Sequence, residues 1–444
     1  MDTNANNNRE SFEDQQVIFV DTHLIQKAVE GLQRAREEFQ TLLEQAEGGD
    51  ASVYYDLGVR YTEGDGTDKD PAQAARWFAL ASEDGDLRAT DLLGRCYQSG
   101  AGVEKDEARA AELFQQAAEQ DYAPAQCDLG LSYENGSGVE KDEARAAECY
   151  LQAAEQDYAP AQTNLAVCYF NGIGVDKDVE CAHQWLEKAA EQGQARAQSL
   201  LGSCYRDGDG VEADAAQAAE WYGKAAKQNY PPAMCSLGLA FELGEGLTED
   251  PAKAVYWYTK AAGEGYAPAQ TNLAVCLLNG TGAERSAEEA VGWLEKAVEQ
   301  EFPRAQGILG DLLLTGNGVP EDKARAVKLY RQAAEQGSSV GQCNLGYCML
   351  KGIGIRPDPA QAVYWFRKAA EGGSGRAMCL LGDCYREGQG VEADAAQART
   401  CYQKAIDLGF DAKEELEELD KAAPAGAAEQ PKKKKSFLGR LFGK

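Results

Sequence analysis

Cysteine is the residue whose spacing in this 444-residue chain comes closest to that of a chemical site. Ten of the thirteen cysteines stand at two fixed places in a recurring pattern: Cys96, Cys168, Cys204, Cys276, Cys348 and Cys384, and Cys127, Cys235, Cys343 and Cys379. Such regularity would suggest disulfides in a small secreted protein. This chain is long, its number of cysteines is odd, and no secretory signal opens it, so we interpret most of them as reduced, apolar packing residues.

Histidine, by contrast, is scarce. Only His23 and His183 occur, which argues against a multi-histidine metal site and against most histidine-based catalysis. The phosphate-binding motif GxxxxGKS/T and the zinc-protease motif HExxH are absent. The recurring GxG sequences follow helical segments rather than strands, so they are not dinucleotide fingerprints. We therefore predict no catalytic residue, no metal site and no cofactor.

The charge is divided unevenly along the chain. The net charge of −29 comes from 44 basic and 73 acidic residues. Residues 431–444 contain six basic residues and no acidic one, which leaves 38 basic and 73 acidic residues, a net −35, on the rest. An acidic body repels nucleic acid, so we expect no nucleic-acid binding there. With no run of 18 apolar residues, the chain is predicted to be cytoplasmic.

A repeat of 36 residues organises most of the chain. A leucine marks each of its ten copies, at Leu57, Leu93, Leu129, Leu165, Leu201, Leu237, Leu273, Leu309, Leu345 and Leu381. Two glycines follow each leucine by seven and nine residues, and an Asp, or Ser286 in one copy, follows by thirteen. Paired glycines suit a tight interhelical turn, and Asp or Ser suits the start of a helix. Each repeat is therefore predicted to be an antiparallel helix pair.

Stacking of ten such pairs gives the predicted fold class. One pair cannot bury its own apolar face, so residues 51–410 are expected to form an all-α solenoid, a right-handed superhelix with a curved, extended surface. The six tryptophans, which share one place in the repeat, are predicted to pack in its core.

The repeat resembles a known family. The segment carrying Ala197, Leu201, Gly202, Tyr205, Gly208, Gly210, Val211, Asp214, Ala218, Trp221, Ala225 and Ala226 is similar to the Sel1-like repeat, a relative of the tetratricopeptide repeat. This resemblance implies a non-enzymatic adaptor that holds protein partners together. Some cysteine-rich members of the family have been linked to β-lactam binding or hydrolysis, which gives the alternative function. Those members carry a Cys-x7-Cys pair in each repeat, and this chain has none.

Partner binding is predicted on the first helix of each repeat, opposite its packed face. Positions two and five residues from the leucine fall on this side, which lines the concave groove in related repeats. The candidate residues are Arg88, Arg95, Phe170, Arg196, Arg206, Leu239, Arg304, Tyr347, Arg376 and Arg386. Arginines beside apolar groups suit an extended peptide with carboxylates and hydrophobic anchors. The alternative is a solvated helix face with scattered arginines.

The two ends fall outside the repeats. Residues 1–20 are predicted to be disordered, and residues 21–47 to form an amphipathic helix that caps the first repeat or pairs with another chain. A terminal helix is expected at 411–421, a flexible linker at 422–431 and a basic amphipathic tail at 432–444.

The tail is the candidate for membrane contact. Its candidate residues are Lys432, Lys433, Lys434, Lys435, Phe437, Leu438, Arg440, Leu441 and Phe442. It resembles the C-terminal membrane-targeting helix of the bacterial cell-division ATPase MinD, which would place the protein at the inner membrane face. Docking to a protein, contact with nucleic acid and a plain solubility role are the alternatives. The partner and the oligomeric state are left open.

Overall fold

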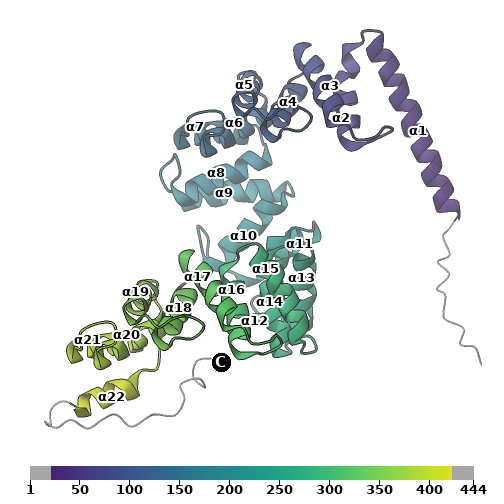
Figure 1. Ribbon diagram of the computed structural model, residues 1–444. Helices are drawn as coiled ribbons and strands as arrows, with labels where there is room; N and C mark the ends of the chain where they lie inside the picture. Colours follow the sequence, from purple (N-terminus) through teal and green to yellow (C-terminus); the bar gives the residue numbers. More distant parts are fainter. Residues whose placement is uncertain (1–21, 423–444) are drawn as a thin grey trace, which may run out of the picture. The chain divides into compact units, whose positions relative to one another are not determined.

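A computed structural model describes residues 22–422, and within that range the chain is helical, with no β-strand (Figure 1). The chain divides into two compact units between Ala213 and Asp214. The first helices of the repeats are η1 with α2 (Ala51–Val53, Tyr54–Glu63), α4 (Leu87–Ser99), α6 (Ala123–Asn135), α8 (Ala159–Asn171), α10 (Ala195–Asp207), α12 (Pro231–Leu243), α14 (Ala267–Asn279), α16 (Pro303–Thr315), α18 (Ser339–Lys351) and α20 (Gly375–Glu387). The second helices are α3 (Pro71–Glu83), α5 (Glu107–Ala118), α7 (Glu143–Glu155), α9 (Val179–Glu191), α11 (Ala215–Lys227), α13 (Pro251–Gly263), α15 (Ala287–Glu299), α17 (Lys323–Glu335), α19 (Pro359–Glu371) and α21 (Ala395–Asp407).

Within each unit, every helix packs on the next one in the sequence. The first helices of neighbouring repeats also touch: α6 contacts α8 in one unit, and α12, α14, α16 and α18 follow one another in the other. Because consecutive first helices lie side by side, side chains on their common face come from several repeats. The predicted α-solenoid of helix pairs is confirmed.

Second helices begin where the sequence predicts. In all ten, the Asp or Ser thirteen residues after the leucine precedes the helix, and its side chain accepts a backbone hydrogen bond. Asp70, for example, accepts from the amides of Ala72 and Gln73, at 3.0 and 3.1 Å. Each cap satisfies amide groups that the first turn of a helix leaves without partners.

The second glycine of each turn is where one repeat meets the repeat before it. Gly102 has φ +77°, and a Cβ placed there would lie 2.0 Å from the carbonyl oxygen of Pro71, the first residue of α3. Only glycine permits both this backbone conformation and this close approach.

The core is centred one residue beyond the tryptophan position. Of the six tryptophans, Trp77 is buried and the other five are half-buried, so most of them, like Trp185, pack against the core without forming its centre. The next residue in the sequence is buried in every repeat, and Tyr150, Tyr258 and Tyr402 are examples with no exposed surface. Periodicity alone did not separate these two adjacent positions, because both lie toward the same side of the helix.

A series of glutamines ties neighbouring repeats together. Gln162 donates from its side chain to the carbonyl of Ala154 in the preceding repeat, at 3.2 Å, and accepts a bond of 2.9 Å from Gln192. The same donation to a carbonyl eight residues earlier recurs at Gln126, Gln198, Gln270 and Gln342. These buried amides therefore link each repeat to the one before it.

Additional helices cover both ends of the array. At one end, α1 (Thr22–Glu47) packs on the first repeat, where the ring of Phe39 meets that of Tyr61 edge-on with centroids 5.2 Å apart. Val29 and Leu32, nearer the start of α1, remain exposed. At the other end, α22 (Lys413–Ala422) packs on α21 and buries Leu419.

Candidate partner-binding face

The ten candidate residues all lie on first helices of the repeats, and we call the surface that carries them the first-helix face. Arg88 and Arg95 lie on α4, Phe170 on α8, Arg196 and Arg206 on α10, Leu239 on α12, Arg304 on α16, Tyr347 on α18, and Arg376 and Arg386 on α20. The first five belong to one compact unit and the last five to the other. Each unit therefore has its own first-helix face.

Apolar candidates are less accessible than the sequence suggests. Phe170 and Leu239 are half-buried, and Tyr347 is only 9% exposed. Residues two positions before the leucine, such as Cys127 and Cys379, are buried as well. Neighbouring first helices approach closely enough to cover these positions, so the expectation that all such positions line an open groove is wrong.

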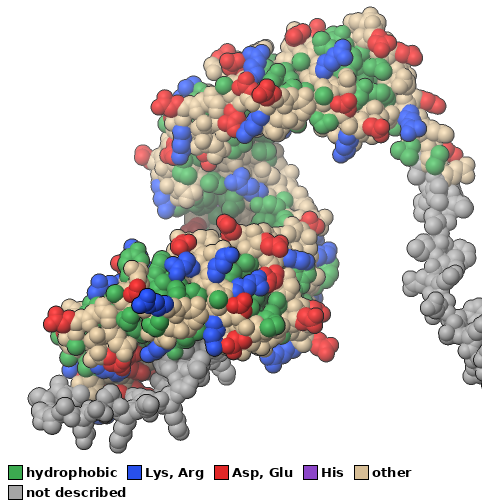
Figure 2. Space-filling model, in the orientation of Figure 1, with side chains coloured by type: hydrophobic (Ala, Val, Ile, Leu, Met, Phe, Trp, Pro, Cys, Tyr) green, Lys and Arg blue, Asp and Glu red, His purple; other side chains and the backbone are tan. Residues whose placement is uncertain are grey.

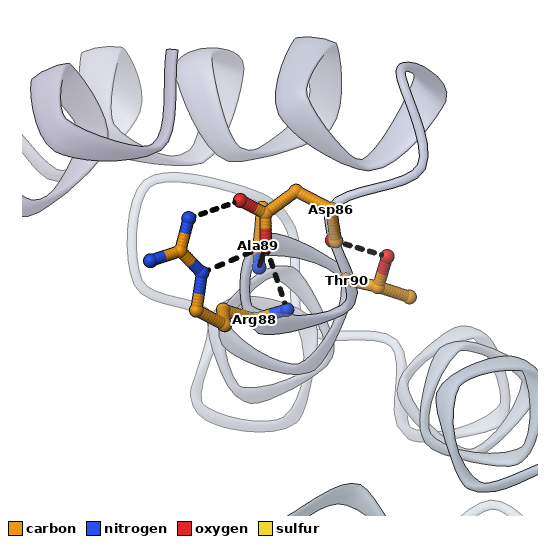
Figure 3. Close-up of polar contacts among 4 residues, drawn as sticks. All are labelled: Asp86, Arg88, Ala89 and Thr90. Carbon is orange, nitrogen blue, oxygen red and sulfur yellow. Dashed lines mark hydrogen bonds and ion pairs between the residues drawn. The ribbon is translucent and has the colours of Figure 1, made fainter. Parts of the chain in front are cut away.

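Several candidate arginines already have carboxylate partners. Arg88 binds both carboxylate oxygens of Asp86, at 3.1 and 2.6 Å (Figure 3). Its guanidinium also lies 4.0 Å from the centre of the Tyr55 ring. Asp86 also caps α4 through the backbone amides of Arg88 and Ala89. These bonds lower the pKa of Asp86 against the opposing effect of its partial burial. The charge of Arg88 is therefore neutralised within the first-helix face.

Arg95 is shared by two acids from adjacent repeats, the buried Asp91 and the half-buried Asp128. Its guanidinium lies 3.0 Å from Asp91 and 2.6 Å from Asp128. Asp91 is 2% exposed, and its second carboxylate oxygen, Oδ1, has no hydrogen-bond partner among the described residues. Burial raises the pKa of Asp91 to about 7, and Arg95 offsets only part of that rise. Burial also raises the pKa of Asp128.

Two further arginines form ion pairs within their own helix or its end. Arg206 lies 2.8 Å from Asp207. Arg386 lies 2.8 Å from Asp383 and 3.1 Å from Glu387. Both sets of ion pairs reduce the positive charge that a partner would meet.

The remaining three arginines are held by neutral amides. Each donates to an asparagine 32 residues earlier, on the first helix of the preceding repeat: Arg196 to Asn164 at 2.8 Å, Arg304 to Asn272 at 2.6 Å and Arg376 to Asn344 at 3.1 Å. Each asparagine in turn donates one repeat further back, to Cys127, Cys235 and Asp311 respectively. We call these three arginines the amide-held arginines. The sequence placed the arginines correctly but did not reveal this difference among them.

A cavity opens on the first-helix face of the last three repeats. It has a volume of about 310 Å³ and is lined by both Tyr347 and Arg376. The structure thus brings together two candidates that the sequence could only place on the same side. Asp311, on α16, also lines it and was not among the predicted residues.

No cluster of three or more His, Cys, Asp or Glu within 22–422 has the geometry of a metal site. His183 is 8% exposed, its ring meets that of Tyr205 edge-on, and burial lowers its pKa. The segment 337–341 matches the hydrolase motif GxSxG, but it joins two helices instead of a strand and a helix. Its Ser339 hydroxyl donates to the carbonyl of Gly372, at 3.2 Å.

The ends of the chain remain predictions. The segment predicted as disordered, 1–20, and the membrane candidates from Lys432 to Phe442 lie outside the described residues. Between Thr22 and Ala422, no helix has the length and apolar character needed to span a membrane.

Helix pairs repeated every 36 residues, tied by glycines, caps and buried amides, define an α-solenoid of the helical-repeat class. The chain belongs to the Sel1 repeat family, whose model matches residues 51–86, 88–122, 123–158, 159–194, 195–230, 231–266, 267–302, 303–338, 339–374 and 375–410.

Two solved structures illustrate the likeness. One is a protective antigen present in uropathogenic Escherichia coli strains that displays an SLR fold; it is 30% identical, with a TM-score of 0.52 over 89% of this chain and 99% of that one. Another is a Sel1 repeat protein from Oxalobacter formigenes, 32% identical, with a TM-score of 0.49 over 70% of this chain and 90% of that one. Comparison with curated proteins found no match.

Proposed function

We propose that this protein is a non-enzymatic scaffold or adaptor that binds extended segments of partner proteins on its first-helix faces. Proteins built from Sel1 and related helical repeats commonly serve as protein-interaction scaffolds. Solenoids suit this role because stacking exposes a long surface made of many similar helices. The partner's identity is not part of the proposal.

The amide-held arginines are the main structural support for this scaffold role. Arg196, Arg304 and Arg376 each donate one hydrogen bond to a neutral asparagine, and none of the three forms an ion pair with a carboxylate of residues 22–422. A guanidinium has five N–H donors in a planar fork that matches a carboxylate. The asparagine fixes the orientation of that fork and leaves other donors for a ligand. Arg88 and Arg206, which already hold Asp86 and Asp207, lack this capacity.

Paired sets of variants test this assignment. One set replaces the amide-held arginines, Arg196→Gln, Arg304→Gln and Arg376→Gln, and the matched set replaces Arg88→Gln and Arg206→Gln. We expect the first set to reduce affinity capture of partner proteins from the cytoplasmic extract of the source cells at least tenfold. The matched set should leave capture within about twofold. Equal capture by both sets, with circular dichroism showing both folded, would refute the proposed face.

Absence of catalysis is part of the same proposal. The alternative, a β-lactamase-like hydrolase, would turn over the chromogenic substrate nitrocefin. We expect hydrolysis by the purified full-length protein to stay at the rate of a buffer blank. A rate that scales with protein concentration and falls on Ser339→Ala would contradict the proposal.

Recruitment to the inner membrane face by the basic tail is the finer part of the proposal. Six basic residues near an anionic surface contribute roughly 1 kcal/mol each, opposed by the acidic body. Full-length protein is therefore expected to sediment with anionic vesicles more than a chain ending at Gln430, with the difference lost in high salt. Equal sedimentation of the two chains would refute membrane binding by the tail and leave the adaptor role untouched.

A further inference from the structure

The cavity on the last three repeats has an apolar chamber and a polar wall. Leu314 of α16, Tyr347 of α18 and Ile353, just after α18, contribute to the chamber. Asp311, Asn344 and Arg376 contribute to the wall. A volume of about 310 Å³ lies at the lower end of ligand pockets, which makes it suitable for one large side chain rather than a cofactor.

The polar wall is a chain of hydrogen bonds that ends in an unused donor. The Tyr330 hydroxyl and the Asn344 amide both donate to Oδ1 of Asp311, at 2.6 and 3.1 Å. Arg376 donates through Nη1 to Asn344, at 3.1 Å, while its Nε–H is buried and has no acceptor among the described residues. The Nε–H itself is enclosed, but the cavity is lined by the same guanidinium, whose remaining N–H groups can donate to an acceptor brought in by a ligand.

The charge around the cavity differs from that of the rest of the chain. Residues 303–374, which form repeats 8 and 9, contain nine Lys and Arg against six Asp and Glu. Each of the other eight repeats has a net negative charge. Lys and Arg side chains gather over α16, α17 and α18 on the face shown in Figure 2. The region therefore attracts anionic segments that the rest of the chain repels.

We propose that this cavity anchors an acidic, extended partner peptide by receiving one of its large apolar side chains, of leucine or phenylalanine size. An Asp or Glu beside that residue accepts a hydrogen bond from the Arg376 guanidinium. This inference rests on the proposed function, because it assigns a site and a ligand class to one of the first-helix faces. The cavity supplies the apolar contact, and the guanidinium supplies orientation.

The two carboxylates that line the cavity already have partners. Oδ1 of Asp311 accepts two hydrogen bonds, and Glu321 forms an ion pair with Lys323 at 2.7 Å. A basic occupant such as the tail at 432–444 would instead meet the positive charge of repeats 8 and 9.

Two peptide pools provide the probe. The acidic pool contains decapeptides of Leu, Phe, Asp, Glu, Gly and Ser in random order, and the basic pool replaces Asp and Glu with Lys and Arg. Binding of each fluorescent pool to the full-length protein is measured by polarisation. We expect the acidic pool to bind at least tenfold more tightly. Preference for the basic pool, or binding of neither pool, would overturn the cavity proposal.

Three variants then locate the binding. Leu314→Trp places a bulky side chain in the chamber, and Arg376→Gln removes the guanidinium donor. Each variant should bind the acidic pool at least tenfold more weakly than the wild type does. Arg356→Gln, at an exposed arginine of repeat 9 that does not line the cavity, should change the binding less than threefold. Thermal melts verify that all three remain folded.

The outcomes separate this inference from the proposed function. Acidic peptides that bind both cavity variants as tightly as the wild type would overturn the cavity site. The adaptor role would still stand if partner capture continued to depend on the amide-held arginines.

Discussion

Replacing Asp91 with asparagine should remove a pH dependence of the free energy of unfolding that arises from burial of this carboxyl group in the second repeat. Asp91 is 2% exposed, its Oδ1 atom has no hydrogen-bond partner within residues 22–422, and the Arg95 guanidinium is divided between Asp91 and Asp128. Because burial penalises the charged form, the pKa of Asp91 rises from its ordinary value of 3.8 to about 7. Asparagine has nearly the same shape but does not ionise.

The sign and size of the effect follow from proton linkage. A raised pKa means that the folded protein binds the proton more tightly than the unfolded chain does. The corresponding stability is complete below pH 3.8 and is lost as the pH rises through about 7. One pKa unit corresponds to about 1.4 kcal/mol, so the full loss is roughly 4 kcal/mol and the part lost between pH 5 and pH 8 is about 2 to 3 kcal/mol. Arg95 lowers the pKa and Asp128 raises it, so both belong to the response.

Urea unfolding followed by circular dichroism at pH 5, 6, 7 and 8 measures the difference between the wild type and Asp91→Asn. We expect the wild type to lose about 2 kcal/mol more than the variant across this range, with most of the divergence complete by pH 7 to 8. Glu83→Gln, at an exposed site at the end of α3 in the preceding repeat, controls for the loss of one negative charge. Parallel pH profiles for the wild type and Asp91→Asn would refute the assignment of a raised pKa to this carboxyl group.

Three further substitutions test the packing of the array by urea unfolding. Gly102→Ala should cost more than 2 kcal/mol, because it adds a backbone clash to a φ of +77°, whereas Gly85→Ala, with φ +94° and open space, should cost about 1 kcal/mol; equal losses would contradict the contact between repeats. Tyr258→Phe should lower the free energy of unfolding by about 1 to 3 kcal/mol, because the Glu242 carboxylate loses the hydrogen bond that it accepts from the Tyr258 hydroxyl at 2.6 Å. An unchanged unfolding midpoint would mean that this bond does not contribute to stability. Asp106→Ala should cost about 1 kcal/mol through loss of the α5 cap, and no loss would show that the cap is replaceable.

Local signals were sufficient to predict the repeat. Leu129 and its equivalents fix the register of the first helix, and Asp142 and its equivalents fix the start of the second, because both act within one repeat. The choice between adjacent positions was harder. Trp257 and Tyr258 are neighbours, yet only the tyrosine is fully buried, because the distinction depends on how the next repeat packs against it.

The candidate site shows the same limit more strongly. Sequence periodicity placed Arg88 and Arg376 on one type of helix face, but the first holds a carboxylate and the second an amide. That difference depends on Asn344, which belongs to another repeat. The cavity was missed for a related reason, since its walls come from three repeats. The reversal of charge in repeats 8 and 9 was the one signal in the sequence that could have indicated it.

Because cysteines recur along the array, the reactivity of their thiols can report local unfolding of individual repeats. All thirteen cysteines are free, and they occur in eight of the ten repeats. Burial raises the pKa of Cys127 and Cys204 to about 12 and that of Cys276 to about 11, so their thiolate forms are rare while their repeats stay closed. Alkylation of each of these sites then proceeds at a rate set by how often its repeat opens, which mass spectrometry can follow site by site. The sequence thereby supplies, without any engineered label, a map of where along the solenoid the stacking is weakest.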